Sequence, residues 1–283
     1  MAATARARDA SRRRPPRSGA SDLLARVLVA VPAIAFAILI VSQGGAVFAL
    51  GIGALALVCL HELFEMLERA RPVRLAAFAA VLGMIAAGTW GTERQVLLAL
   101  AASVPVTFAL AVAMPQRERV TASLAATYLG ILWIGLGVAH AALLRGLEHG
   151  GALVFLVLLG TFAGDTGAYL GGRTFGTRRL APRISPNKTV EGLAIGVVVG
   201  TAAVWYASRT YSGSWITGTD GLLLGLAIAL SAPVGDLFES LVKRDMGAKD
   251  TGGLFGAHGG ALDRLDAVLF SLVAGYYVWL ALA

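Results

Sequence analysis

The sequence predicts an all-α fold: a polytopic transmembrane helical bundle of about nine spans, with its N-terminus in the cytoplasm. Three observations support this prediction. Hydrophobic residues make up 57% of the chain and charged residues only 14%, whereas soluble domains carry about 25% charged residues. Apolar runs of about 20 residues, long enough to cross a ~30 Å hydrocarbon core as helices, recur along the whole chain. Finally, Lys and Arg are distributed unequally between alternate loops.

The apolar runs define the spans, and each is expected to be helical because backbone groups inside a bilayer must be satisfied internally. Residues 1–20 are rich in Arg, Ala, Ser and Pro and are expected to form a disordered basic tail. The run that follows is longer than a signal-peptide core and lacks a small-residue cleavage site, so it counts as the first span. We expect spans at about 22–42, 46–64, 74–91, 95–114, 122–144, 150–171, 190–208, 221–242 and 264–282.

The positive charges predict the orientation of the bundle. With a cytoplasmic N-terminus and nine spans, all but three of the 24 Lys and Arg residues fall on the cytoplasmic side, the exceptions being Arg94, Arg145 and Arg209. A miscounted span would destroy this asymmetry, which the positive-inside rule explains. The net charge of +7 therefore argues little for a nucleic-acid partner, and none is expected. The single cysteine, Cys59, lies within an apolar run and is expected to have a packing role.

Carboxylates are few in the first half of the chain. His61, Glu62 and Glu65 close the second span, where they fit either an interfacial helix end or a contribution to a polar site. Beyond residue 160 the first carboxylate is Asp165, near the cytoplasmic end of the sixth span. An ionised Asp in a membrane helix is costly unless it is paired or binds a metal ion, so it indicates either a functional site or a pair that holds helices together.

A second cluster covers residues 182–192. Ser185 followed by Pro186 predicts a helix that begins there, and the free N–H groups of a helix start, with Lys188 nearby, are suited to binding an anion. The preceding segment 171–179 is expected to be a basic, glycine-rich loop able to surround phosphates. No Walker A motif is present, which excludes a P-loop NTPase.

The third cluster is the densest. If the eighth span continues as a helix, Asp236, Ser240 and Lys243 share one face. Asp263 and Asp266 are three residues apart at the start of the ninth span, after another glycine-rich loop. Carboxylates with open positions beside basic residues are what Mg²⁺ uses when substrate phosphates complete its coordination. A salt-bridge network would explain the charges but not the glycines or their gathering at one face.

The run from Ser240 to Asp266 resembles the signature of the phosphatidate cytidylyltransferase family, also called CDP-diacylglycerol synthases. The matching residues are Ser240, Lys243, Arg244, Lys249, Asp250, His258, Gly259, Gly260, Asp263, Arg264 and Asp266. The stretch from Asp165 to Gly192 is similar to the family's upstream motif. The sequence departs from the family at residues 256–257, which are Gly-Ala rather than Pro-Gly, and at Asn187, where Lys is common. The resemblance covers residues 160–283.

The resemblance implies transfer of a cytidylyl group from CTP to phosphatidate, giving CDP-diacylglycerol and pyrophosphate, with Mg²⁺, alone or together with a second metal ion, as cofactor. It implies Asp236 and Asp263 as metal ligands with Asp165 and Asp266 as helpers. It implies that Ser240 and His258 belong to the site and that phosphates are held by Lys188, Lys243, Arg244, Lys249 and Arg264. Residues 21–145 are then N-terminal transmembrane helices, and residues 146–283 form the catalytic region. The partners expected are CTP, phosphatidate and the lipid bilayer of the inner (plasma) membrane, and the family suggests a homodimer.

Two alternatives remain at this point. One is a CTP-dependent enzyme that acts on a different lipid phosphate or on a lipid alcohol. The other is an ion-coupled transporter, but transporters place their sites near the midplane between repeated halves, whereas these carboxylates gather at one face of the C-terminal half.

Overall fold

The computed structural model describes residues 19–113, 119–211, 215–248, 250–252 and 259–283, with side chains described from residue 31 onward. The chain divides into two units, Met1–Leu39 and Ile40–Ala283. The first unit contains most of helix α2 (Gly19–Gln43). The elements described below belong to the second unit.

Apolar helices dominate this unit, as predicted. They are α3 (Gly45–Met66), α4 (Arg74–Trp90), α5 (Glu93–Ala113), α6 (Val120–Gly130), α7 (Leu136–Gly146), α8 (Gly150–Phe175), α9 (Val190–Tyr211), α10 (Gly218–Asp245) and α11 (Leu262–Leu282). A short π-helical segment, η3 (Ile131–Gly135), joins α6 to α7 so that residues 120–146 form one continuous rod, and a 3₁₀ turn, η2 (Glu68–Ala70), follows α3. Each of the nine expected spans coincides with α2, with this rod or with one of the other helices. Among the described residues, seven helices are long and apolar enough to cross a membrane, while α4 is shorter. The protein is an all-α polytopic membrane bundle.

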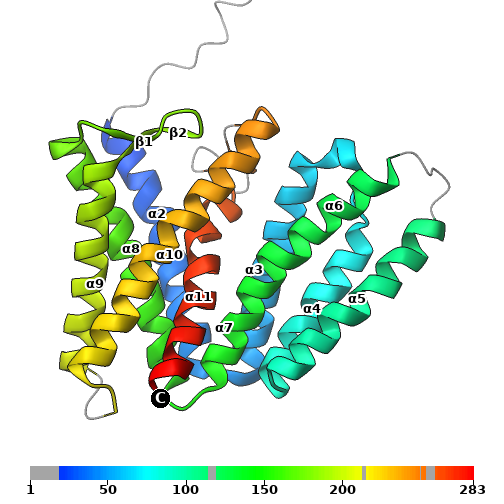
Figure 1. The fold of residues 1–283 in the computed structure, drawn as a ribbon, viewed down its shortest axis with the longest axis horizontal. Coiled ribbons are helices and arrows are strands. Elements are labelled where there is room, and N and C mark those ends of the chain that lie inside the picture. The colour runs from blue at the N-terminus through cyan, green and yellow to red at the C-terminus, as the bar shows by residue number, and fades with distance from the viewer. Residues whose placement is uncertain (1–18, 114–118, 212–214, 249, 253–258) are drawn as a thin grey trace, which may run out of the picture. The chain divides into compact units, whose positions relative to one another are not determined.

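Counting residues 120–146 as one rod, successive helices of this unit run in alternating directions (Figure 1). The loops after α3, α8 and α10, together with the first turn of α6, lie at one end of the bundle, which we call the site end. The loops after α4, α7 and α9 lie at the other end. Arg94, Arg145 and Arg209 belong to this second end, whereas the other described Lys and Arg residues of this unit belong to the site end, so these residues show the separation of charges expected from the sequence.

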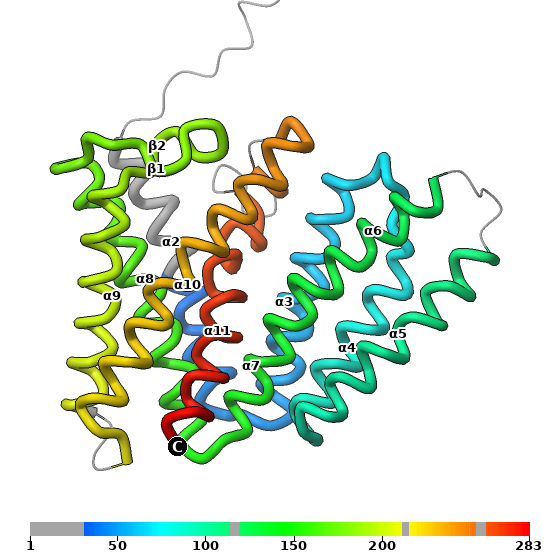
Figure 2. Tube along the Cα trace, in the orientation of Figure 1, coloured from blue at the N-terminus to red at the C-terminus, as the bar shows by residue number. Residues whose placement is uncertain are grey.

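Helix α11 joins the two sides of the bundle. It contacts α10 and α8 on one side and α7 and α3 on the other (Figure 2). Its side chains Leu269, Leu272 and Tyr276 are buried in one continuous apolar core. Cys59 is a free, buried thiol in the same core, which confirms its packing role. The N-terminal helices therefore pack directly against the helix that carries Asp263 and Asp266.

The glycines of residues 171–179 have a packing role that differs from the prediction. We expected a phosphate-binding loop, but α8 continues to Phe175. A Cβ atom on Gly171 would lie 2.6 Å from Ile195 Cδ1, and one on Gly196 would lie 2.8 Å from the Gly164 carbonyl oxygen. Small residues at these positions let the backbones of α8 and α9 approach closely, as is common between membrane helices.

The segment that contains Ser185 and Pro186 is a strand, and the predicted helix start at Ser185 is wrong. Strand β2 (Ser185–Thr189) pairs antiparallel with β1 (Arg179–Ala181) to form a hairpin at the site end. A residue before proline favours an extended backbone, and proline is tolerated on an edge strand. The cap of α9 is Thr189, whose hydroxyl oxygen accepts the N–H of Gly192 at 3.1 Å. Lys188 therefore lies in a strand just before the helix.

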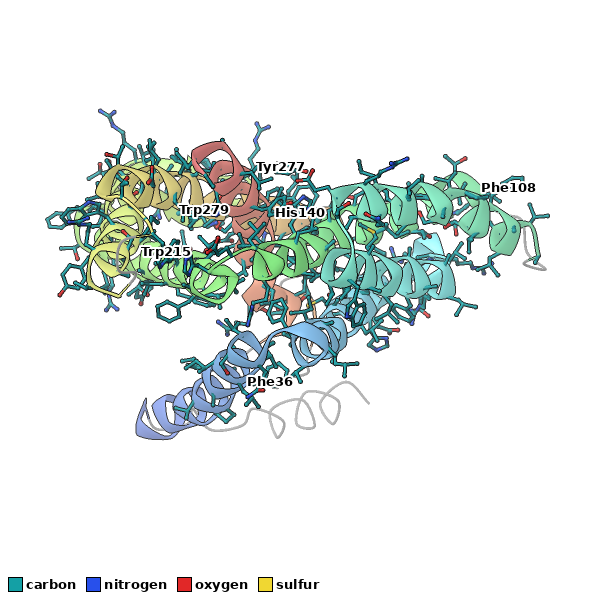
Figure 3. All side chains as sticks on the ribbon, turned by 90° about the horizontal axis from the view of Figure 1, so that it is seen from below. Phe36, Phe108, His140, Trp215, Tyr277 and Trp279 are labelled. Carbon is teal, nitrogen blue, oxygen red and sulfur yellow. The ribbon has the colours of Figure 1, made fainter. Side chains whose placement is uncertain are left out.

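Aromatic side chains gather at the end of the bundle opposite the site end. Trp215 stacks on His149 with ring centroids 4.5 Å apart and meets Trp279 edge-on at 5.4 Å. His140 Nε2 lies 3.2 Å from the hydroxyl oxygen of Tyr277, and Figure 3 shows the two side chains side by side. Tryptophan and tyrosine prefer the interface between membrane and water. This end is therefore suited to an interfacial position.

Candidate active site

The sequence-predicted site residues come from four segments that meet at the site end: α8, the β1–β2 hairpin, the C-terminal turns of α10 and the first turn of α11 (Figures 1 and 2). Helix α10 runs uninterrupted to Asp245, so the helical face predicted for Asp236, Ser240 and Lys243 is present. Two ion pairs connect three of these segments.

The first ion pair connects the hairpin to α10. Lys188 Nζ lies 2.5 Å from Asp236 Oδ2, and the Ser240 hydroxyl donates to Asp236 Oδ1 at 3.5 Å. Arg244 adds a second connection, since its Nε–H donates to the carbonyl oxygen of Ile184 in the hairpin turn at 3.2 Å. Asp165, on α8, lies close enough to Asp236 and Lys188 to interact electrostatically with both. The structure thus brings Asp165, Lys188, Asp236 and Ser240 together.

The second ion pair connects α10 to α11. Lys243 Nζ donates to Asp263 Oδ1 at 2.8 Å and also to Glu239 Oε2, one turn earlier on its own helix. All three side chains are largely shielded from solvent, with 13% of Lys243, 2% of Glu239 and 11% of Asp263 exposed. The ammonium group that Glu239 and Asp263 share should therefore stabilise the folded protein, because a buried charge without a partner is strongly unfavourable.

Backbone groups fix the orientation of Asp263. Its Oδ2 accepts the N–H of Gly260 at 2.7 Å and the N–H of Thr251 at 3.1 Å. Gly259, with φ of 80°, occupies the left-handed region that favours glycine. The glycines of this loop thus allow the backbone to turn its N–H groups toward the carboxylate.

Asp266 lies one turn further along α11 and is 7% exposed. A Cβ atom on Gly235 would collide with the carbonyl oxygen of Asp266 and would lie 3.0 Å from Ala267 Cα. Gly235, directly before Asp236, therefore permits a close approach of α10 to α11. This contact brings the helix turns of Asp236 and Asp266 together at the site end.

Sequence reasoning missed Glu239 and left the role of Glu62 open. Glu239 is 1% exposed and also lies within interaction range of Asp263 and Asp266. Its spacing of four residues before Lys243 was the available signal. Glu62, on α3, is 5% exposed, and its Oε2 accepts the N–H of Leu262 at 3.0 Å. Glu65, in contrast, is an exposed helix-end residue paired with Arg74 at 2.8 Å.

Arg264 is exposed in the first turn of α11. Lys249 and His258 lie outside the described residues.

The acidic side chains of the site are oxygen donors of the kind that bind a magnesium ion. Among the described residues, Lys243 contacts both Glu239 and Asp263, and Asp266 lies within its electrostatic range, so three carboxyl groups gather around one ammonium group. Within the part of the chain that the structure describes, no three acidic, His or Cys side chains form a ready-made metal cage. Mg²⁺ is commonly held by one or two carboxylates plus substrate phosphates rather than by such a cage. A set of oxygen donors in which carboxyl groups outnumber the ammonium group therefore fits this ion.

Comparison with known proteins assigns the chain to a family. Relatives named phosphatidate cytidylyltransferase include one from Mycobacterium leprae, 40% identical over 168 residues, which are 59% of this chain and 53% of the relative. One from Mycobacterium bovis is 38% identical over 166 residues, or 58% of this chain and 53% of the relative. One from Synechocystis sp. is 46% identical over 121 residues, or 41% of this chain and 39% of the relative. The matched part of the chain thus spans about half the length, or less, of these relatives.

The match to a family model is longer. The model described as "Cytidylyltransferase family" covers residues 24–282, nearly all of the chain and including all four segments of the candidate site. This chain belongs to the cytidylyltransferase family.

Proposed function

We propose that this protein transfers the cytidylyl group of CTP to phosphatidate, forming CDP-diacylglycerol and pyrophosphate. The observation that carries the proposal is the pair of Lys–Asp contacts, Lys188–Asp236 and Lys243–Asp263, at one end of a membrane bundle of this family. Relatives named for this activity share 38–46% of the aligned residues.

The reaction needs positioning and charge neutralisation more than proton transfer. An oxygen of the lipid phosphate, ionised at neutral pH, forms a bond to the α-phosphorus of CTP. The bond from that phosphorus to the oxygen bridging to the β-phosphorus breaks, and pyrophosphate leaves with the electron pair. No general base is needed, so the protein contributes in-line alignment and stabilisation of the charge on the phosphate oxygens.

The lysines are suited to hold these phosphates. Lys188 and Lys243 each approach the cluster from a different segment, and each is held in place by carboxylates. Their ammonium groups are compact point charges that can turn to a phosphate oxygen. Arg244 and Arg264, which are exposed at the site end, are proposed to bind the outer phosphates. Lys249 and His258 are proposed to bind phosphate as well, because they belong to the sequence motif that resembles the family signature.

We further propose Asp236 and Asp263 as ligands of Mg²⁺, with Asp165 and Asp266 as additional ligands. When bound, the ion supplies charge neutralisation at the reacting phosphates. The three carboxyl groups gathered around Lys243 support this assignment. Ser240 orients Asp236 through its hydroxyl group.

The location of the site also suits the substrates, because CTP is dissolved in water and phosphatidate in the bilayer. The charged cluster lies at the ends of membrane-spanning helices. The excess of Lys and Arg at the same end supports a cytoplasmic orientation in the inner membrane.

The test is to incubate the purified protein with Mg²⁺ and CTP labelled at the α-phosphate, adding phosphatidate, a polyprenyl phosphate or diacylglycerol in separate reactions. We expect labelled CDP-diacylglycerol and unlabelled pyrophosphate with phosphatidate. Label incorporated only with another lipid phosphate would refute the substrate assignment. Transfer of the γ-phosphate to diacylglycerol, followed with γ-labelled CTP, would refute the reaction class.

A variant and a matched control connect the activity to the site. Asp263→Asn is expected to remain folded in the membrane and to abolish product formation. Asp245→Asn changes an exposed carboxylate at the end of α10 and is expected to keep near-normal turnover. Near-normal turnover by Asp263→Asn would remove the metal-ligand role.

A further inference from the structure

Glu62 lies far from the sequence motifs yet touches the segment that presents Asp263. It belongs to α3, and its carboxylate accepts the N–H of Leu262, 200 positions later in the chain, at 3.0 Å. The side chain is only 5% exposed. A Cβ atom on Gly252 would lie 2.6 Å from Glu62 Oε1, and one on Gly260 would collide with Oε2. The backbone around residues 252 and 260–262 therefore encloses this carboxylate.

The position of Leu262 explains what the contact does. Leu262 is the first residue of α11, and the residue before it, Ala261, provides no side-chain cap. The first N–H groups of a helix have no partner within the helix, and the positive end of the helix dipole favours an anion. Glu62 supplies the missing acceptor from another helix. The first turn that it caps carries Asp263 and Asp266.

The same segment is tied down from its other side. Asp263 accepts N–H groups from Thr251 and Gly260 and pairs with Lys243. Gly260 thus lies between the carboxylates of Glu62 and Asp263, with its N–H directed at Asp263 and its Cα against Glu62. Loss of the Glu62 contact would release the start of α11 from α3 and let Asp263 move relative to Lys243.

We propose that Glu62 is a positioning residue of this enzyme: it caps α11 from α3 and thereby holds Asp263 in the geometry needed for cytidylyl transfer, a role that rests on the function proposed above. Glu62 acts through the backbone of residues 260–262 and does not touch the substrates. The N-terminal half of the chain thus contributes to a site whose motifs all lie in the C-terminal half.

The experiment combines hydrogen exchange with kinetics. In Glu62→Ala, we expect exchange at the Leu262 amide to accelerate on the order of 10- to 100-fold, the loss expected for a hydrogen bond to a charged group. We expect exchange in α5 and α8 to stay unchanged. We also expect kcat to fall while KM for CTP stays nearly constant, because substrate binding groups are intact.

Two further variants serve as controls. Glu62→Gln keeps an acceptor oxygen, so its exchange rate and kcat should fall between those of the wild type and Glu62→Ala. Glu65→Ala changes the neighbouring glutamate of the same helix end, which pairs with Arg74, and should alter neither exchange at Leu262 nor kcat.

The proposal is overturned if exchange at Leu262 is unchanged in Glu62→Ala, if exchange rises uniformly across the bundle, or if KM for CTP rises at constant kcat. If Glu62→Ala does not fold, Glu62→Gln decides, and wild-type exchange at Leu262 in that variant contradicts the capping role. Hydrogen exchange needs no substrate. A wild-type protein without cytidylyl transfer would therefore refute the proposed function while leaving the exchange result to decide the role of Glu62 in capping.

Discussion

Replacing Lys243 by Met offers a direct test of how the site is held together. The substitution keeps most of the side-chain volume but removes the ammonium group that both Glu239 and Asp263 contact. These carboxylates are 2% and 11% exposed, so water cannot replace the lost partner. Removing one partner of a buried ion pair leaves an uncompensated charge and typically costs about 3–5 kcal/mol.

This cost is large enough to measure by thermal unfolding in detergent. For a chain of this size each kcal/mol corresponds to a change in Tm of roughly 2–4 °C, so we expect Lys243→Met to lower Tm by about 10 °C. Lys188→Met is the matched control, since it removes the other lysine of the site. The Lys188 Nζ atom is itself shielded from solvent, but the Lys188 and Asp236 side chains are 24% and 35% exposed, more than Lys243 and its partners, so losing this pair should cost less than losing Lys243.

A double variant identifies the origin of the loss. Adding Glu239→Gln to Lys243→Met removes one uncompensated carboxylate and should recover part of the lost stability, giving a non-additive cycle. The reasoning would be refuted if Lys243→Met were as stable as the wild type. It would also be refuted if Lys188→Met lowered Tm by the same amount, because burial would then not be the deciding variable.

Three further predictions address packing, capping and the metal ion. Gly235→Ala should destabilise the protein by about 1–3 kcal/mol and reduce activity, because its Cβ atom would press on the Asp266 backbone. Gly83→Ala, where the Cβ atom meets nothing within 4 Å, should not destabilise the protein. Equal melting curves for the two variants would contradict the packing role of Gly235. Thr217→Ala removes the capping box that Thr217 forms with Asp220 at the start of α10 and should cost about 0.5–2 kcal/mol in denaturant unfolding, without changing kcat. Strong chelator should abolish product formation and Mg²⁺ should restore it, whereas full turnover in chelator would exclude the proposed role of magnesium.

The carboxylates of α10 could be predicted only in part from local sequence. Asp236, Ser240 and Lys243 share a helical face because of their spacing, and the structure confirms that face. Glu239 is on the same helix, but its importance depends on burial beneath α11, which no local pattern reveals. The helix start expected at Ser185 failed for a related reason, since Ser185 and Pro186 suit either a helix start or a strand. Pairing with residues 179–181 decided for the strand.

The sequence by itself determined that this chain is a bundle of membrane helices with its charged chemistry at one end. Length and hydropathy of each apolar run are sufficient for that, because the bilayer imposes the same requirement on every span. Only the tertiary structure decided which charges meet. Glu62 accepts a hydrogen bond from Leu262, 200 positions later in the chain, and Lys243 forms an ion pair with Asp263 of the next helix. Such contacts depend on how closely helices approach and which groups they shield from water, and these are properties of packing between segments rather than of any one segment.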